Sequence, residues 1–580
     1  MSTTATAIPT PIVTRAAKAE PRAKSFLHHA KLIGFLTLIS RFFGLAREII
    51  ATHYLGTDLV GTAFSVAFAI PNLFRKLFGE GALSAAFIPL YAQQVKHESS
   101  DQANNFAAAA VNLLVAILIA LTIAGEAIIA ILCVLELRRG AAAREDQLLT
   151  LKLAAIMLPY VLLICGGAFL SGILQVHKRF GVPAATPIIL NAVQIAVLLI
   201  GARLVHLTGK TADAAAVARQ TRLAYGLAGF ILIAGALQVS ALLPSLRATG
   251  FRFRFVPHFW TPAIKKMLVL SLPVALGAGV LQLSVILDKG ISLMLMQGQD
   301  QAGHLITTFH FLGHVIRYPM EEGAPRRLDL AQFLYQFPLG IFAIALATAI
   351  FPGLSSDALD RDRTKFRNVL RQGIEASLWE GLPASVGLML VAQPAARLLF
   401  QHGQVPPHHA ALIAQSTAIY AAAIWAFSLL QIINRAYYAV HDTVTPLVMA
   451  IVNIVINLLV EIPLVWTKLG ESGMAAGTVV SFAVQALIML WMLNRRIGGL
   501  GLKQSASPIA KMLVATVVMA LACLALQHSR LYPHTITRIA WAEQLTMTLL
   551  LGGGIYLLLC KLMNVNVLNE LLPHGARENA

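Results

Sequence analysis

Long apolar stretches recur from one end of the chain to the other, and they constrain the fold more than any other feature. We count about fourteen, each close to the roughly 20 residues that an α-helix needs to cross a bilayer. They lie at residues 30–54, 59–78, 105–134, 148–174, 183–205, 223–246, 264–297, 328–353, 378–400, 408–433, 444–467, 472–494, 507–527 and 541–563. Only 12% of the residues are Asp, Glu, Lys or Arg. Soluble domains could not bury so much apolar surface, so we predict an all-α polytopic membrane protein with about 14 transmembrane helices.

The charge is strongly positive, with 45 Lys and Arg against 27 Asp and Glu, a net charge of +18. In a soluble protein this excess would suggest nucleic acid, but here the basic residues lie mostly in short polar connections between apolar stretches. We therefore expect no nucleic-acid partner. The connections on the N-terminal side, at 178–179, 247–266, 361–371 and 495–503, hold roughly twice the basic residues of the opposite ones, which predicts that both termini are cytoplasmic.

A faint internal repeat suggests two halves. Residues 69–93 resemble residues 335–357, with proline early and an F-I-P or I-F-P triplet late. Duplicated helix bundles that face each other across a central cavity are typical of transporters. We predict a disordered basic tail (1–28), two pseudo-symmetric six-helix lobes (29–246 and 247–503), and two C-terminal helices with a tail (504–580). Residues 81–95 are expected to be re-entrant or interfacial.

Ionisable residues inside apolar stretches are the strongest functional signal, because each costs at least about 2.5 kcal/mol at the centre of a membrane helix. The first stretch holds Arg41, Arg47 and Glu48, and the second ends with Arg75 and Lys76. Arginine binds phosphate oxygens with two donors and never loses its proton, so converging arginines would form an anion site. The alternatives are that Arg41 extends to the membrane surface, and that Arg75 and Lys76 anchor a helix end.

Two later stretches also carry polar residues. Asp288 and Lys289 are adjacent, and Asn453 and Asn457 are spaced to lie on one helix face. The first pair is either a local ion pair or part of a site, and the asparagines either hold helices together or supply oxygen ligands for a small cation with Asp288. There is no Walker A sequence, so we do not expect ATP-driven transport by this chain alone.

Three segments resemble one known family. SRFFGLAREIIATHYLG, followed by VAFAIPNLFRKLFGEGALSAAFIPLYA, is similar to the MurJ (MviN) family, and so is the later segment INRAYYAVHDTVTP. These are lipid II flippases of the multidrug/oligosaccharidyl-lipid/polysaccharide exporter superfamily. The resemblance extends over the whole chain.

The resemblance implies a V-shaped transporter in the bacterial cytoplasmic membrane. Its substrate would be lipid II, the undecaprenyl-diphosphate-linked peptidoglycan precursor, and the last two helices would form a groove for the lipid tail. The family's cavity arginines fall on Arg41, Arg47 and Arg75, with Glu48 at the acidic position. Its sodium site is similar to Asp288, Asn453 and Asn457, although Asn457 stands where some members have Asp.

One departure concerns a substrate-facing arginine in the eighth helix of the family, which falls on Phe333 here. A long connection, about 298–327, precedes that helix and ends in Arg326 and Arg327. We hypothesise that Arg326 or Arg327 supplies the lost charge.

From these features we predict a transporter rather than an enzyme, which flips lipid II to the periplasmic leaflet by alternating access. Its return step would be driven either by the membrane potential or by a cation at the Asp288 site, for which Na+ is the candidate. No other cofactor is expected, and the chain is expected to act as a monomer among membrane lipids. The alternatives are an exporter of another polyprenyl-linked glycan and a membrane-embedded glycosyltransferase. The latter needs a catalytic carboxylate in an outer loop, for which Glu321 and Glu322 are the candidates.

Overall fold

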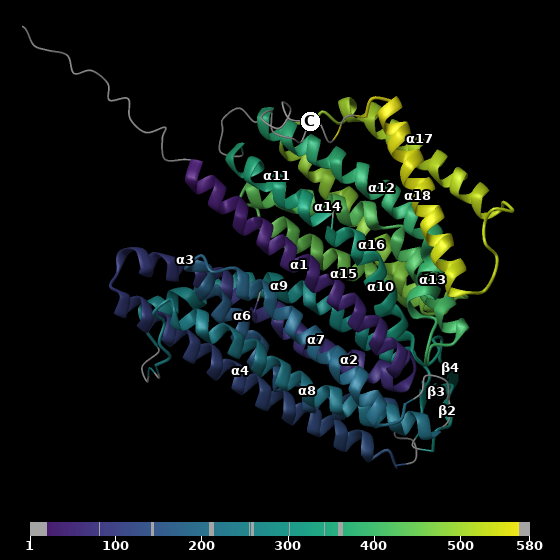
Figure 1. The fold of residues 1–580 in the computed structure, drawn as a ribbon, viewed down its shortest axis with the longest axis horizontal. Helices are drawn as coiled ribbons and strands as arrows, with labels where there is room; N and C mark the ends of the chain where they lie inside the picture. Colours follow the sequence, from purple (N-terminus) through teal and green to yellow (C-terminus); the bar gives the residue numbers. More distant parts are fainter. Residues whose placement is uncertain are drawn as a thin grey trace, which may run out of the picture.

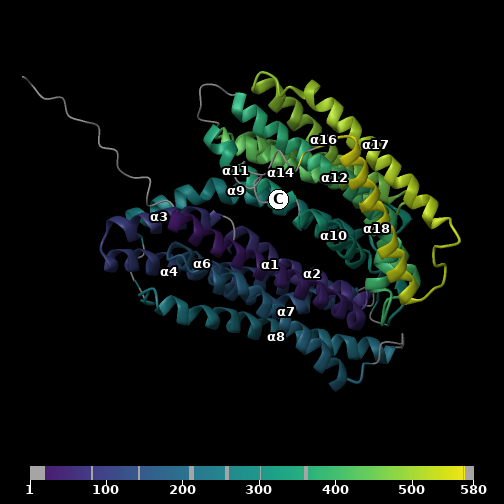
Figure 2. The same ribbon diagram turned by 45° about the horizontal axis from the view of Figure 1, so that its top comes forward.

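The computed structural model is built almost entirely from helices. It describes residues 20–79, 82–140, 144–207, 214–254, 256, 260–300, 302–341, 343–357, 364–565 and 567. Two groups of helices lie side by side, apart at one end of the molecule and close together at the other (Figures 1 and 2). The chain is a helical polytopic membrane protein, as its apolar stretches predict.

The first lobe is formed by the N-terminal helices. These are α1 (Glu20–Leu55), α2 (Leu59–Phe74), the π-helix η1 (Arg75–Gly79), α3 (Ala82–His97), α4 (Ser100–Leu137), α5 (Glu145–Met157), α6 (Tyr160–Val176), α7 (Gly181–Leu204) and α8 (Ala214–Arg247). One continuous cluster of buried apolar side chains joins them, with the ring of Phe87 packed between those of Phe106 and Phe169. Residues 20–28, predicted as part of a disordered tail, belong to α1, whereas residues 1–19 lie outside the described residues.

The second lobe is also a bundle of helices. It contains α10 (Ala324–Ile341), α11 (Ala343–Asp357), α12 (Thr364–Phe400), α13 (Pro407–Ala421), α14 (Ile424–Ala439), α15 (Val444–Val465) and α16 (Ser472–Arg496). The last two helices, α17 (Leu502–Gln527) and α18 (Arg538–Leu562), pack on each other and on the outside of α12. Tyr556 of α18 donates a hydrogen bond of 2.8 Å to the carbonyl of Trp379 in α12, which fixes this contact.

Helix α9 (Pro262–Leu295) connects the lobes. The Thr261 side chain caps its first turn by accepting from the Ile264 amide, as is typical of a helix start. Ile264 and Met267 are buried in the core of the first lobe, whereas Met296, just past the other end, is buried in the second. The division into lobes at residue 247 stays a prediction, since α9 contributes to both cores.

All fourteen predicted stretches coincide with a helix or with two consecutive helices. By length and composition, eight helices among the described residues can cross a membrane, or ten if two bent pairs each make one span. Those pairs are α5–α6, bent by 44°, and α13–α14, bent by 45°. The number fourteen therefore stays a prediction. Residues 82–97, covering most of the expected re-entrant piece, form the helix α3.

Between α9 and α10 the chain forms two small β-hairpins. Strand β1 (Gly298–Gln299) pairs with β2 (Leu305–Ile306), and β3 (Thr308–Phe311) with β4 (His314–Arg317), both antiparallel. They lie where the two lobes come together, and we call this the hairpin end of the molecule (Figure 1).

Candidate functional site

A cavity of about 1000 Å³ lies between the first lobe and the helices α9 and α10. Its charged lining is mainly cationic: Arg47, Arg75, Lys76, Lys289 and Arg326 face two carboxylates, Glu48 and Asp329. Because these charges lie inside an apolar bundle, each is costly unless it is paired or serves a ligand. The excess of cations therefore suits an anionic ligand.

Glu48 lies at the centre of the charged part of the cavity. Its Oε2 is 2.8 Å from Arg47 Nη2, and its Oε1 is 2.6 Å from Arg326 Nη1. Arg326 also donates to Thr52 Oγ1 at 2.8 Å. One carboxylate thus holds two guanidinium groups, one from each lobe, and leaves a net positive charge.

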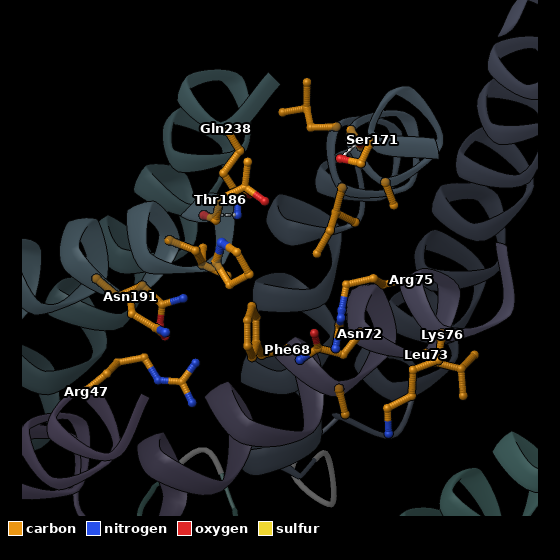
Figure 3. Close-up of a pocket in the computed structure, with 18 of the residues that line it drawn as sticks. Arg47, Phe68, Asn72, Leu73, Arg75, Lys76, Ser171, Thr186, Asn191 and Gln238 are labelled. Atoms are coloured by element: carbon orange, nitrogen blue, oxygen red, sulfur yellow. Dashed lines mark hydrogen bonds between the residues drawn. The ribbon is translucent and has the colours of Figure 1, made fainter. Parts of the chain in front are cut away.

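A local change in the second helix positions Arg75. Helix α2 continues through Pro71 and then becomes the π-helix η1, whose first two residues are Arg75 and Lys76. Single π turns are frequent at functional sites, because they shift side chains relative to a regular helix. Figure 3 shows Arg75 beside Asn72, with the ring of Phe68 between Arg75 and Arg47 in this view.

Asp329 of α10 joins three elements. It forms an ion pair with Lys289 of α9 and accepts a hydrogen bond from Ser65 of α2. Among the described residues, Lys289 thus forms its ion pair with Asp329 and not with its neighbour Asp288, which corrects the local ion pair considered from the sequence. Phe333 lies one turn further along α10 and also lines the cavity.

Arg41 and Arg327 lie elsewhere than the sequence suggested. Neither is among the described residues that line the cavity. The Arg41 guanidinium packs directly against Gly340 of α10, where a Cβ would collide with it. Arg327 is fully buried and donates from Nε and Nη2 to the carboxylate of Glu471 at 2.9 and 2.5 Å, which ties α10 to the start of α16.

The lobes contact each other directly at the hairpin end, beyond Glu48. Nδ1 of His53 lies 2.9 Å from Nδ1 of His402, and Thr57 Oγ1 lies 2.7 Å from His409 Nδ1. The amide of Gln404 donates to the carbonyl of His53 at 3.1 Å. We call this set of contacts the seam. It closes the space between the lobes on this side.

Two glycines permit this close approach. Gly403 has φ +64° and packs against the carbonyl of His53, and Gly323 has φ +89° and packs against the carbonyl of Thr57. At both, a Cβ would overlap the opposing backbone, and the left-handed conformation itself favours glycine.

Burial also lowers the pKa of His402, in the connection between α12 and α13, below its usual 6.5.

A second polar cluster joins α9 and α15. The amide nitrogen of Asn457 donates to Asp288 Oδ1 at 3.1 Å and to Glu461 Oε2 at 2.9 Å. Asn453 is buried one turn earlier, and its Nδ2, like Asn457 Oδ1 and Glu461 Oε1, has no partner among the described residues. The cluster therefore holds two carboxylates and unpaired oxygens in an apolar setting.

The comparison with known families decides the identity. The family model described as "Lipid II flippase MurJ" matches residues 51–540. The chain belongs to the MurJ family of lipid II flippases. It is therefore a transporter and not an enzyme, in line with the resemblance found in its sequence.

Individual relatives agree with this assignment. The chain is 31% identical over 458 residues to the probable lipid II flippase MurJ of Rhizobium meliloti, covering 79% of this chain and 78% of that protein. It is 27% identical over 505 residues to the lipid II flippase MurJ of Burkholderia cenocepacia, covering 85% and 87%.

Solved structures show the same fold. A structure titled "Lipid II flippase MurJ, inward closed conformation" aligns with a TM-score of 0.71 and 21% identity, over 93% of this chain and 99% of that one. An inward-facing multidrug resistance MATE transporter aligns with a TM-score of 0.59 and 14% identity, over 82% and 99%.

Several residues of the cavity, of the second polar cluster and of the seam were not predicted from the sequence. Asp329 was not singled out, although it follows Arg326 by three residues and so lies on the same helix face. Glu461 was assigned no role, although it is four residues after Asn457 and therefore lies on the same helix face. No sequence signal shows that His53 and His402 meet, because 349 residues separate them.

Proposed function

We propose that the chain moves lipid II from the cytoplasmic to the periplasmic leaflet through the cavity between its lobes, by alternating access. The observation that carries this proposal is the cavity's excess of cations, which Arg47, Arg75 and Arg326 supply from three different elements. The diphosphate of a polyprenyl-linked precursor is a matching anion. Its charge would offset the mutual repulsion of the arginines, and the bidentate geometry of guanidinium suits phosphate oxygens.

Alternating access requires that the two sides of the cavity open in turn. The contacts of the seam support a state in which the hairpin end is closed. The ion pair between Glu48 and Arg326 connects the lobes. When the head group has bound, its diphosphate competes with Glu48 for Arg326. A diphosphate that takes over Arg326 weakens this connection, and the lobes can then part at the hairpin end.

The orientation belongs to the same proposal. The excess of basic residues on the N-terminal side supports cytoplasmic termini and a periplasmic hairpin end. The lipid tail stays in the bilayer, against the exposed apolar side chains of α17 and α18, such as Val517 and Leu550. We take a monomer as the working unit, because the helices of one chain form both lobes around the cavity.

We also propose that the cluster of Asp288, Asn453 and Asn457 holds the coupling cation, with Glu461 as a further oxygen donor. Carboxylate and amide oxygens suit a small hard cation such as Na+, and the unpaired oxygens of Asn457 and Glu461 fit that role. A bound cation would supply the positive charge that two neighbouring buried carboxylates require. Removal of Na+ is expected to slow transport, and Asp288→Asn to abolish the dependence on Na+.

Proteoliposomes test the transport step. Purified protein is reconstituted with lipid II that carries a fluorophore on its head group, and a membrane-impermeant quencher reports the fraction that crosses the bilayer. Arg47→Ala and Arg326→Ala should each lower the rate at least tenfold. Arg495→Ala is the matched control, since this exposed arginine stacks on Trp491 outside the cavity lining. Equal rates for all four proteins would refute the role of the cavity.

A further inference from the structure

One wall of the cavity is polar but uncharged. The part that α6, α7 and α8 contribute has no Asp, Glu, Lys or Arg among the described lining residues, whereas α1, η1, α9 and α10 provide all its charges. We call the following six side chains the amide wall: Ser171, Gln175, Thr186, Asn191, Gln194 and Gln238. The charged and the uncharged polar residues of the cavity thus come from different helices, and we call the charged set the cationic side.

Gln194 of α7 is the most deeply buried residue of this wall. Only 2% of it is exposed, and its Nε2 has no hydrogen-bond partner among the described residues. Leaving a buried donor unpaired costs free energy, and native proteins rarely do so without a reason. A ligand that accepts a hydrogen bond would remove this cost.

Other residues of the wall are held in place. Gln238 accepts a hydrogen bond of 3.0 Å from the Tyr160 hydroxyl and donates one of 2.9 Å to the carbonyl of Thr186. Asn191 donates at 3.4 Å to the carbonyl of Ser40 in α1. Figure 3 shows Gln238 next to Thr186, and Asn191 near Arg47, with Phe68 between Asn191 and Arg75 in this view. The wall is therefore organised before any ligand binds.

The chemistry of the wall defines what it binds. Amides and hydroxyls without a formal charge match a neutral ligand rich in hydroxyl and amide groups, and an aromatic ring such as Phe68 offers a flat apolar surface. N-acetylated sugars have both properties, because acetamido and hydroxyl groups edge a ring whose C–H faces are apolar.

We propose that the amide wall binds the N-acetylated sugars of the transported lipid, with Gln194 Nε2 donating to an acetamido carbonyl. This inference rests on the proposed function, since it takes the diphosphate to lie on the cationic side. The cationic side then binds any polyprenyl diphosphate, and the amide wall distinguishes those that carry amide-bearing sugars.

Binding to the purified full-length protein in nanodiscs tests the proposal. The probes are lipid II, the same lipid without its peptide, and undecaprenyl diphosphate, which has no sugar. Gln194→Leu should weaken binding of both sugar-bearing lipids by about 5- to 30-fold, the loss expected for one buried hydrogen bond. Its binding of undecaprenyl diphosphate should not change. Gln194→Met, which keeps the length of the side chain but removes its amide, should show the same pattern.

Two controls separate this inference from the proposed function. Gln485→Leu removes a buried glutamine of α16 outside the cavity lining and should leave binding of all three lipids unchanged. Arg47→Ala should weaken binding of all three. If Arg47→Ala binds all three lipids as the wild type does, the proposed function is wrong, whatever the result for Gln194→Leu.

The remaining outcomes concern the amide wall alone. The melting temperature of Gln194→Leu should equal or exceed that of the wild type, because the variant removes an unpaired donor. A lower melting temperature would indicate a structural role and overturn the proposal. So would an effect on lipid II but not on the lipid without peptide, since the wall would then bind the peptide.

Discussion

Alanine at Gly403 should force the seam open. A Cβ at this position would lie 2.6 Å from Nδ1 of His53 and closer still to its carbonyl oxygen. The strain of an alanine at φ +64° is present whether the seam is closed or open, so it does not change the balance between these states. The overlap exists only in the closed state, and overpacking of this kind costs about 1–3 kcal/mol. The equilibrium should therefore move toward the open hairpin end by about 5- to 150-fold.

Spin labels across the hairpin end would measure this shift. Leu204, at the end of α7, and Leu531, between α17 and α18, are 74% and 78% exposed and belong to different sides of the molecule. Distances between labels at these positions, recorded in nanodiscs by pulsed electron resonance, should show a longer population in Gly403→Ala. Gly140→Ala is the matched control, because Gly140 has φ +59° but a Cβ added there would meet no atom within 4 Å.

Two results would contradict this prediction. If Gly403→Ala gives the same distance distribution as the wild type, the seam does not hold the closed state. If Gly140→Ala shifts the distribution as much as Gly403→Ala, backbone strain rather than overlap is responsible.

Three further predictions follow from the same structure. Arg327→Ala should lower the melting temperature, since it leaves Glu471 buried without its partner at a cost of about 3–5 kcal/mol; an unchanged melting temperature would contradict this. Asp288→Asn should make lipid II transport in proteoliposomes insensitive to replacing Na+ by K+, and a variant that remains Na+-dependent would exclude this cluster. Burial lowers the pKa of His402, so the stabilisation that this residue gives the closed seam is present above pH 6.5 and is lost as the pH falls through the lowered pKa. Acidification should therefore lengthen the Leu204–Leu531 distance more in the wild type than in His402→Gln, and equal changes would refute the role of this imidazole.

The helical elements were largely predictable, because membrane helices are determined by local hydropathy. Each apolar stretch coincides with a helix or helix pair, and even the bend between α5 and α6 falls next to Pro159. The extension of α1 back to Glu20 was missed, because a short polar segment lacks the periodic apolar residues from which a helix is predicted. The segment of helix α3 was expected to be re-entrant or interfacial, because its 16 residues are short for a span.

The candidate site was predictable only in part. Arg47, Glu48 and Arg75 stand out because charges are costly in lipid, and they lie in the cavity lining. The energetic cost of a buried charge does not show which residue it pairs with. The sequence therefore could not tell which of Arg326 and Arg327 lies in the cavity. In the structure one faces Glu48 and the other Glu471.

Uncharged cavity residues were harder still to recognise. Asn191 and Gln194 lie on the buried face of α7 with Leu190 and Leu198, and amides at such positions also hold helices together. Only the three-dimensional arrangement shows that this face lines a cavity. The same holds for the seam, which joins segments from opposite halves of the chain.

Exposure of lipid II on the outer leaflet is the most direct test of the central claim. Bacteria depleted of their own flippase would express the wild type, Arg47→Ala or Arg495→Ala, and a probe that acts only from outside would report accessible lipid II. The wild type and Arg495→Ala should restore exposure, and Arg47→Ala should not. If the wild type is inserted in the membrane and lipid II stays inaccessible, the chain does not flip lipid II. If Arg47→Ala restores exposure fully, lipid II does not cross through the cationic cavity.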